Sequence, residues 1–339
     1  MAIEMTKKRD RGLQRLLVGL AVATLVSLVP ARAEADPLAC GDTLSGDETY
    51  VLTADVGPCP GLGPAIIVEG PATLKLNGWS VICDHVVTLV PDPDDGVLTA
   101  VVTFGMLDSV GIVLTGTGAE LRGAGSYTEG ANPEPKNSVM GCGHNVIVEG
   151  EGKHEVTGVT SVVALSGAFV VSSNENELTG NVIQQYFLEP DPVRPVKSAG
   201  TGFTIEGHEN GLYKNVAADS LEHGFQLDGN ENHLEDNVAR DNEEYGVVVE
   251  GHGNRISSNS SAKNIGGGFL VGEEAEENRL SHNTSSENGD GDPANGFEIH
   301  GSDNLLYANT ADHNGQFGII LTATAQGNVI TKNAVSRSE

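Results

Sequence analysis

Residues 202–207 read GFTIEG, and this pattern returns along the second half of the chain. The later copies are GFQLDG (224–229), GVVVEG (246–251), GFLV (268–271), GFEIHG (296–301) and GIIL (318–321), so that their starts lie 22, 22, 22, 28 and 22 residues apart. Phe203 and Ile205 alternate with Thr204 and Glu206, which is the periodicity of a β-strand. A repeat of this length indicates a solenoid of stacked units.

A second pattern runs in step with the first. Each unit carries an Asn, an aliphatic residue two positions later and another Asn three positions after that. The triplets are Asn176/Leu178/Asn181, Asn210/Leu212/Asn215, Asn232/Leu234/Asn237, Asn254/Ile256/Asn259, Asn278/Leu280/Asn283, Asn304/Leu306/Asn309 and Asn328/Ile330/Asn333. Asn fits a turn because it tolerates the left-handed backbone and forms local hydrogen bonds. Stacked Asn side chains can also hydrogen-bond from one unit to the next.

These units favour an all-β fold. Their strands are short, Gly and Asn bound them, and no unit has room for a helix. We therefore predict a single-stranded right-handed parallel β-helix with coils of about 22 residues, stacked at the strand spacing of ~4.8 Å. Phe203, Phe225, Phe269 and Phe297 should form one inward stack, with Val247 filling the gap between them. The Leu-x-x-Leu-x-Leu pattern of a leucine-rich repeat is absent.

The chain divides into three predicted parts. Residues 1–35 read as a secretory signal peptide, because basic residues precede an apolar run from Leu16 to Pro30 and small residues then offer cleavage sites. The run has 15 residues, fewer than the ~20 of a spanning helix, so we expect no membrane span after cleavage. Residues 36–63 should form an N-terminal cap and residues 64–339 the β-helix. The expected location is secreted or periplasmic.

The charge of the chain limits its partners. There are 47 acidic and 19 basic residues, which gives a net charge of −28. Such a surface repels nucleic acid and anionic lipid, so neither is an expected partner. It also makes a polyanionic glycan harder to bind without bridging cations. Solubility in a salty medium is the simpler explanation of the charge.

The four cysteines all lie in the first half of the chain. Cys40 and Cys59 flank a segment outside the repeat, and we predict that they form a disulfide in the cap. Cys83 and Cys142 either pair as well or are buried thiols, because four cysteines allow three connectivities. No Cys-x-x-Cys is present, so the sequence gives no support to a zinc or redox motif.

Three segments carry a family resemblance. Residues 40–44 (CGDTL), 57–60 (GPCP) and 74–78 (LKLNG) resemble the opening of many secreted bacterial β-helix proteins. The Asn-x-Leu-x-x-Asn units are similar to repeats of the pectate-lyase-like superfamily, which includes the periplasmic NosD type and polysaccharide lyases, hydrolases and epimerases. The resemblance covers nearly all of residues 40–339 and implies the fold. The resemblance says little about activity, since the repeat motif reflects only the geometry of the coil.

Stacking would turn repeat positions into columns. The position after each GFTI-like strand gives Glu206, Asp228 and Glu250, and His252 follows two residues later. These residues should point outward on the face that carries the active site in the resembling enzymes. Carboxylates one or two coils apart would be ~5 or ~10 Å apart, and glycosidases use separations of ~5–9.5 Å. The four residues are therefore candidate catalytic residues, and the alternative is a solvated acidic stripe.

The 28-residue unit contains a candidate calcium loop. Asn288, Asp290 and Asp292 place oxygen-bearing side chains at every second position, as at the start of a calcium loop. Pro293 stands where the loop needs Gly, and no Glu follows at position twelve. Calcium is the one candidate cofactor, and a polar surface loop is the alternative.

Two functions remain open at this point. The first is an exported non-catalytic β-helix that binds carbohydrate or lies at the cell surface. The second is a polysaccharide lyase or glycoside hydrolase that acts through the outward carboxylates. No Arg or Lys stands beside these carboxylates in the repeat, which weakens the lyase version. We favour the first, with a polysaccharide as partner, and the sequence leaves the oligomeric state open.

Overall fold

The computed structural model describes residues 37–61, 63–83, 85–91, 98–104, 109–124, 136–184, 186–187, 195–289 and 293–336. The predicted signal peptide lies outside these residues, and so do Asp290 and Asp292 of the candidate calcium loop. The chain separates into two units, residues 1–36 and 37–339. The following description concerns the second unit.

Three parallel sheets, here called A, B and C, run the length of this unit, and each contains 11 strands among the described residues. Sheet A consists of β1 (Asp42–Leu44), β4 (Pro64–Glu69), β9 (Val110–Thr115), β12 (His144–Val148), β15 (Gly167–Val171), β20 (Thr201–Ile205), β23 (Phe225–Leu227), β26 (Tyr245–Val249), β29 (Gly267–Val271), β32 (Asn295–Ile299) and β35 (Ile319–Leu321). Sheet B consists of β2 (Thr49–Val51), β5 (Thr73–Lys75), β10 (Glu120–Arg122), β13 (Glu155–Thr157), β16 (Glu177–Thr179), β21 (Gly211–Tyr213), β24 (His233–Glu235), β27 (Arg255–Ser257), β30 (Arg279–Ser281), β33 (Leu305–Tyr307) and β36 (Val329–Thr331).

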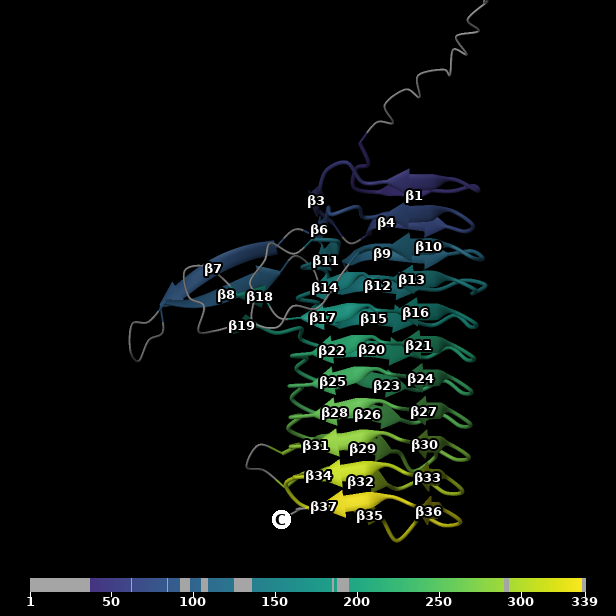
Figure 1. Cartoon of the computed structure of the whole chain (residues 1–339). Helices are drawn as coiled ribbons and strands as arrows, with labels where there is room; N and C mark the ends of the chain where they lie inside the picture. The colour runs from purple at the N-terminus through teal and green to yellow at the C-terminus, as the bar shows by residue number, and fades with distance from the viewer. Residues whose placement is uncertain are drawn as a thin grey trace, which may run out of the picture. The chain divides into compact units, whose positions relative to one another are not determined.

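Sheet C completes each coil. It consists of β3 (Val56–Cys59), β6 (Val81–Cys83), β11 (Ser138–Met140), β14 (Thr160–Val162), β17 (Val182–Gln184), β22 (Val216–Ala218), β25 (Val238–Arg240), β28 (Ser260–Ala262), β31 (Thr284–Ser286), β34 (Thr310–Asp312) and β37 (Ala334–Ser336). The chain visits A, B and C in turn, and the coils stack one upon another as a parallel β-helix (Figure 1). The predicted fold class is confirmed.

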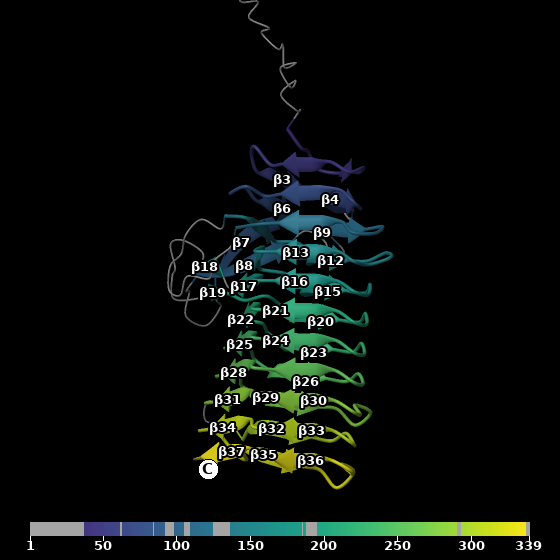
Figure 2. The same ribbon diagram turned by 45° about the vertical axis from the view of Figure 1, so that its right-hand side comes forward.

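Two antiparallel strand pairs interrupt this succession. β7 (His85–Pro91) pairs with β8 (Leu98–Phe104), and β18 (Tyr186–Phe187) pairs with β19 (Pro195–Val196). Each pair is inserted after a strand of sheet C, the first after β6 and the second after β17. Both pairs lie beside the stacked coils (Figures 1 and 2). The three main sheets continue past them with the same register between coils.

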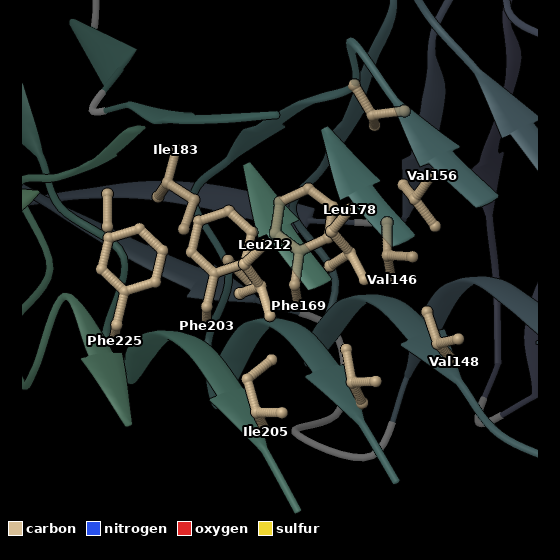
Figure 3. Close-up of a cluster of buried hydrophobic side chains, with 14 of the residues drawn as sticks. Val146, Val148, Val156, Phe169, Leu178, Ile183, Phe203, Ile205, Leu212 and Phe225 are labelled. Atoms are coloured by element: carbon tan, nitrogen blue, oxygen red, sulfur yellow. The ribbon is translucent and has the colours of Figure 1, made fainter. Parts of the chain in front are cut away.

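The core is built from columns of inward side chains. Phe169, Phe203 and Phe225 are fully buried and stack with ring centroids 4.7 and 4.8 Å apart (Figure 3). Phe269 and Phe297 stack in the same way at 4.7 Å, and Val247 lies in register between the two groups. The ring separation equals the strand spacing because each ring comes from one coil. The predicted Phe stack is confirmed, and Phe169 extends it upstream.

Asn ladders form the corners of the coils. In the ladder that contains Asn215, Asn237 and Asn259, the backbone N–H and the side-chain amide of each Asn donate to the side-chain oxygen of the next, at 2.9–3.0 Å. The amide nitrogen of Asn237 also donates to the Leu212 carbonyl of the preceding coil at 2.9 Å. These side chains are buried, so the ladders satisfy backbone groups that the turns would otherwise leave without a partner.

The structure corrects two details of the ladder prediction. The left-handed residue at each corner precedes the Asn: Asp236, for example, has φ 58°, whereas Asn237 does not have a positive φ. A third ladder, at the corner after sheet C, consists of Asn242, Asn264, Asn288 and Asn314. The sequence contained a pattern that predicts this ladder, since each of these residues follows, by five positions, an Asn of the ladder that contains Asn237.

Two disulfides secure the N-terminal coils. Cys40 pairs with Cys59, as predicted, and Cys83 pairs with Cys142, which the sequence left open. The segment expected to cap the repeats carries β1, β2 and β3, which pair with β4, β5 and β6, so it forms a coil of its own. The second disulfide joins neighbouring coils across 59 residues, and closing such a loop stabilises the folded state by about 4 kcal/mol in the loop-entropy account.

Candidate functional site

The predicted acidic column lies on the outside of sheet A. Glu206, Asp228 and Glu250 each follow the last residue of a sheet-A strand, and the register places them directly above one another in successive coils. All three side chains are exposed. Successive members are therefore about one strand spacing apart, ~4.8 Å along the axis.

A groove opens where this column is interrupted. Its volume is about 590 Å³, and it is lined by Asp228, Asn230, Glu250, Gly251, His252, Leu270, Gly272, Glu273, Glu274 and His300. Of the four candidate catalytic residues, Asp228, Glu250 and His252 contribute to this groove and Glu206 does not.

Two local features of the sequence create the groove. Gly272 takes the place of a carboxylate in the column, and a Cβ atom there would collide with the Glu250 carboxylate. The turn that follows is also longer: Asn254 and Asn278 are 24 residues apart, whereas Asn232 and Asn254 are 22 apart. The longer turn places Glu273 and Glu274 in the groove lining. This deviation from the 22-residue spacing was the signal that the sequence offered for these two residues.

The groove is electrostatically negative. Partial burial in the groove raises the pKa of the Glu250 carboxyl, and the neighbouring charges of Asp228, Glu274 and Glu273 raise it further, whereas His300 opposes the shift. A carboxyl group with a raised pKa can hold a proton and donate it, which is the property that a general acid requires. Among the lining residues there is no Lys or Arg.

His300 belongs to a polar cluster that the sequence did not reveal. Its Nε2 lies 2.7 Å from Oε1 of Glu298, while Oε2 of Glu298 accepts bonds from Asn295 Nδ2 at 2.8 Å and from the Tyr245 hydroxyl at 3.1 Å. Burial alone would raise the pKa of Glu298, but the bonds from His300, Asn295 and Tyr245 outweigh it, and the net pKa is lowered. Burial and the Glu298 charge raise the pKa of Tyr245 to about 12. The cluster therefore keeps Glu298 ionised and fixes the ring of His300 at the groove.

One ring nitrogen of His252 is occupied by a hydrogen bond within the fold. Its Nδ1 accepts the Glu276 backbone N–H at 3.3 Å, and His208 accepts the Asn230 backbone N–H at 2.9 Å in the same way. An Nδ1 that accepts a hydrogen bond carries no proton, so in this geometry the proton of the His252 ring is on Nε2. The ring can then offer one N–H group to a ligand in the groove.

Of the candidate calcium ligands, Asn288 is the one that lies among the described residues. Asn288 is 1 % exposed, and its side-chain amide donates to Ser261, Ser285 and Asn314 within the third ladder. Its oxygen accepts from Asn264, so the Asn288 side chain is committed to the ladder. Asp290 and Asp292 lie outside the described residues. Within the described ranges, no group of three or more His, Cys, Asp or Glu side chains is arranged to hold a metal ion.

Comparisons with known proteins agree with this architecture. The family model described as "Right handed beta helix region" matches residues 135–285. The Dettilon tailspike protein (gp208) superposes with a TM-score of 0.61 at 16% identity, over 88% of this chain and 60% of the tailspike chain. A double mutant of the periplasmic alginate epimerase AlgG superposes with a TM-score of 0.50 at 12% identity, over 87% of this chain and 75% of the epimerase.

At such identities the likeness is one of fold, and this chain spans about three fifths of the tailspike's length. No curated protein sequence matches it. The part of the chain that the structure describes contains no helix that could cross a membrane. The handedness given by the matching family agrees with the prediction from the repeat, and the chain is a right-handed parallel β-helix repeat protein.

Proposed function

We propose that this protein is an exported, non-catalytic glycan-binding β-helix, and that the groove beside Glu250 holds an uncharged part of a polysaccharide. The composition of the groove carries the proposal. Carboxylates accept hydrogen bonds from sugar hydroxyls, and the His252 ring can donate one through its Nε2–H. An anionic sugar would meet four carboxylates and no Lys or Arg in the lining, so a neutral sugar fits better.

Further observations support a carbohydrate partner and export. The tailspike and the alginate epimerase are built on the same fold, and the second is named for a polysaccharide and for the periplasm. Both cysteine pairs of this chain are oxidised, which is typical of proteins outside the cytoplasm.

A glycoside hydrolase is the second candidate. The raised pKa of Glu250 favours it, because that carboxyl could protonate a leaving oxygen, and Asp228 supplies a second carboxyl group one coil away. The groove lining contains no Phe, Tyr or Trp on which a sugar ring could stack, and hydrolysis needs the ring held in one geometry against both carboxyl groups, which binding alone does not.

One experiment separates the two candidates. The mature protein is applied to an array of neutral and acidic glycans, and the same glycans are assayed for new reducing ends. We expect binding to neutral glycans, no new reducing ends, and at least ~10-fold weaker binding by Glu250→Gln, equal to ~1.4 kcal/mol. Glu206→Gln removes an equivalent charge outside the groove and should bind like the wild type.

New reducing ends that disappear in Glu250→Gln would establish the hydrolase instead. An array without any bound neutral glycan would refute the binding proposal.

A further inference from the structure

The outward face of sheet B carries a column whose charge reverses along the solenoid. From β10 to β30 this column consists of Glu120, Glu155, Glu177, Gly211, His233, Arg255 and Arg279, each aligned with the next by the parallel register. Uncharged residues continue it at both ends, Thr49 and Thr73 before Glu120 and Leu305 and Val329 after Arg279. Between β10 and β30, acidic residues thus come first along the column and basic residues last. The inward neighbours, Leu or Ile in most coils and Val156 in one, do not vary in this way.

Arg255 and Arg279 are the unusual members of the column. Both are exposed and face each other across adjacent strands, where two like charges destabilise a sheet. Among the described residues neither forms an ion pair, whereas Arg122, Lys153 and Lys263 each pair with a Glu. In a chain with 47 acidic residues, two guanidinium groups without an ion pair keep their charge available to a ligand.

Tyr307 and Lys332 extend this basic surface by two coils. The Arg279 guanidinium lies 5.8 Å and the Lys332 ammonium 4.9 Å from the centre of the Tyr307 ring. Lys332 also donates to the Tyr307 hydroxyl at 2.9 Å, so the ring holds both cations in place. We call Arg255, Arg279, Tyr307 and Lys332 the cationic strip. It is bounded on its N-terminal side by Glu235, whose carboxylate lies 3.7 Å from His233.

We propose that the cationic strip on sheet B binds the carboxylates of an acidic polysaccharide, as a second glycan site separate from the sheet-A groove. Arg forms paired hydrogen bonds to a carboxylate, and two Arg one strand spacing apart can hold a chain that runs along the solenoid axis. The proposal does not depend on the groove.

The chemistry of the strip favours a glycan over nucleic acid. Double-stranded DNA carries one charge per ~1.7 Å and needs many cations along its length. The strip offers three, and the chain as a whole carries a net charge of −28. An acidic glycan with one carboxylate per sugar needs fewer cations, and its sugar hydroxyls can bond to neutral groups beside the cations, such as Ser257 on the same strand as Arg255.

The test measures binding of polygalacturonate and alginate oligosaccharides by calorimetry, at low salt and with a chelator that prevents cation bridging. Carboxyl-reduced oligosaccharides of the same length serve as the uncharged comparison. We expect the acidic forms to bind, the reduced forms not to bind, and affinity to fall as salt rises. Arg255→Ser and Arg279→Ser should each weaken binding about tenfold or more, and Arg279→Lys should lie between Arg279→Ser and the wild type because it keeps the charge and loses the paired bonds.

Lys75→Ser is the matched control, since Lys75 is an exposed outward cation on strand β5 of the same sheet. It should bind like the wild type, as should Glu206→Gln, which removes a charge on sheet A outside the groove. An equal loss in Lys75→Ser, or no binding by the wild type, would overturn the proposal. Equally tight binding of single-stranded DNA would overturn the assignment to a glycan. Unchanged melting temperatures show that the variants are folded.

Discussion

The inside and the outside of the coils follow opposite rules. Inward columns repeat nearly the same residue from coil to coil, as the Phe stack and the three Asn ladders do. Outward columns change: the position of Glu206 holds Asp228, Glu250, Gly272 and then His300 in the next coils. Inward repetition is required because each residue packs on its own copy one coil away. An outward residue meets solvent, so it can differ without disturbing the fold. Both proposed glycan sites lie where outward columns change.

Removing one ring from the interior tests this contrast most strongly. Phe225→Ala should lower the free energy of unfolding by ~3–5 kcal/mol, because the ring is fully buried and its loss leaves a cavity in the stack. The adjacent outward change Gln226→Ala should cost less than ~0.5 kcal/mol. Denaturant titration of both variants measures the difference. Equal costs would mean that the interior stack contributes no more than the surface.

Breaking a ladder should have the next largest effect. Asn237→Leu removes the bonds to Leu212 and Asn259 and leaves the Asn215 backbone N–H without its acceptor. We expect a loss of ~1–3 kcal/mol in the free energy of unfolding. Glu235→Gln, two residues away on the outside of the same coil, should change stability little. An unfolding midpoint that Asn237→Leu leaves unchanged would contradict a stabilising role for the ladder.

His154 gives the smallest effect, and one that depends on pH. This buried residue lies one coil before Asn176, in the ladder that continues through Asn210 and Asn232. Its Nδ1 accepts the Ala119 N–H at 3.0 Å, and its Nε2 bonds to the Glu149 carbonyl at 2.9 Å. Burial lowers the pKa of His154 below its ordinary value of 6.5. The unfolded chain therefore takes up a proton more readily, and the stability that the neutral ring contributes is lost as pH falls from about 6.5 towards the lower pKa of the folded state.

The variant His154→Asn, which restores the residue found elsewhere in the ladder, should lose this part of the acid sensitivity. Melting temperatures of both proteins between neutral and mildly acidic pH test the expectation. Identical pH profiles would show that His154 does not titrate with folding.

Much of this protein could be predicted from the sequence, because a solenoid makes its contacts between equivalent positions of neighbouring repeats. The spacing of Phe203 and Phe225 gives their contact, and the spacing of Asn215 and Asn237 gives the ladder. The Cys40–Cys59 disulfide was predictable from the position of both residues in one segment outside the repeat. The acidic column followed from the same periodicity.

Features that do not follow the repeat could be seen only in the tertiary structure. Cys83 and Cys142 are 59 residues apart, with segments between them that interrupt the repeat, so no spacing predicted their bond. The groove depends on the space above Gly272 and on the path of the longer turn through Glu273 and Glu274. The Tyr245–Glu298 bond joins outward side chains from strands two coils apart, and its formation depends on how far each side chain reaches. A one-dimensional repeat fixes which residues share a column, but side-chain length, missing side chains and added turn residues decide where that column becomes a site.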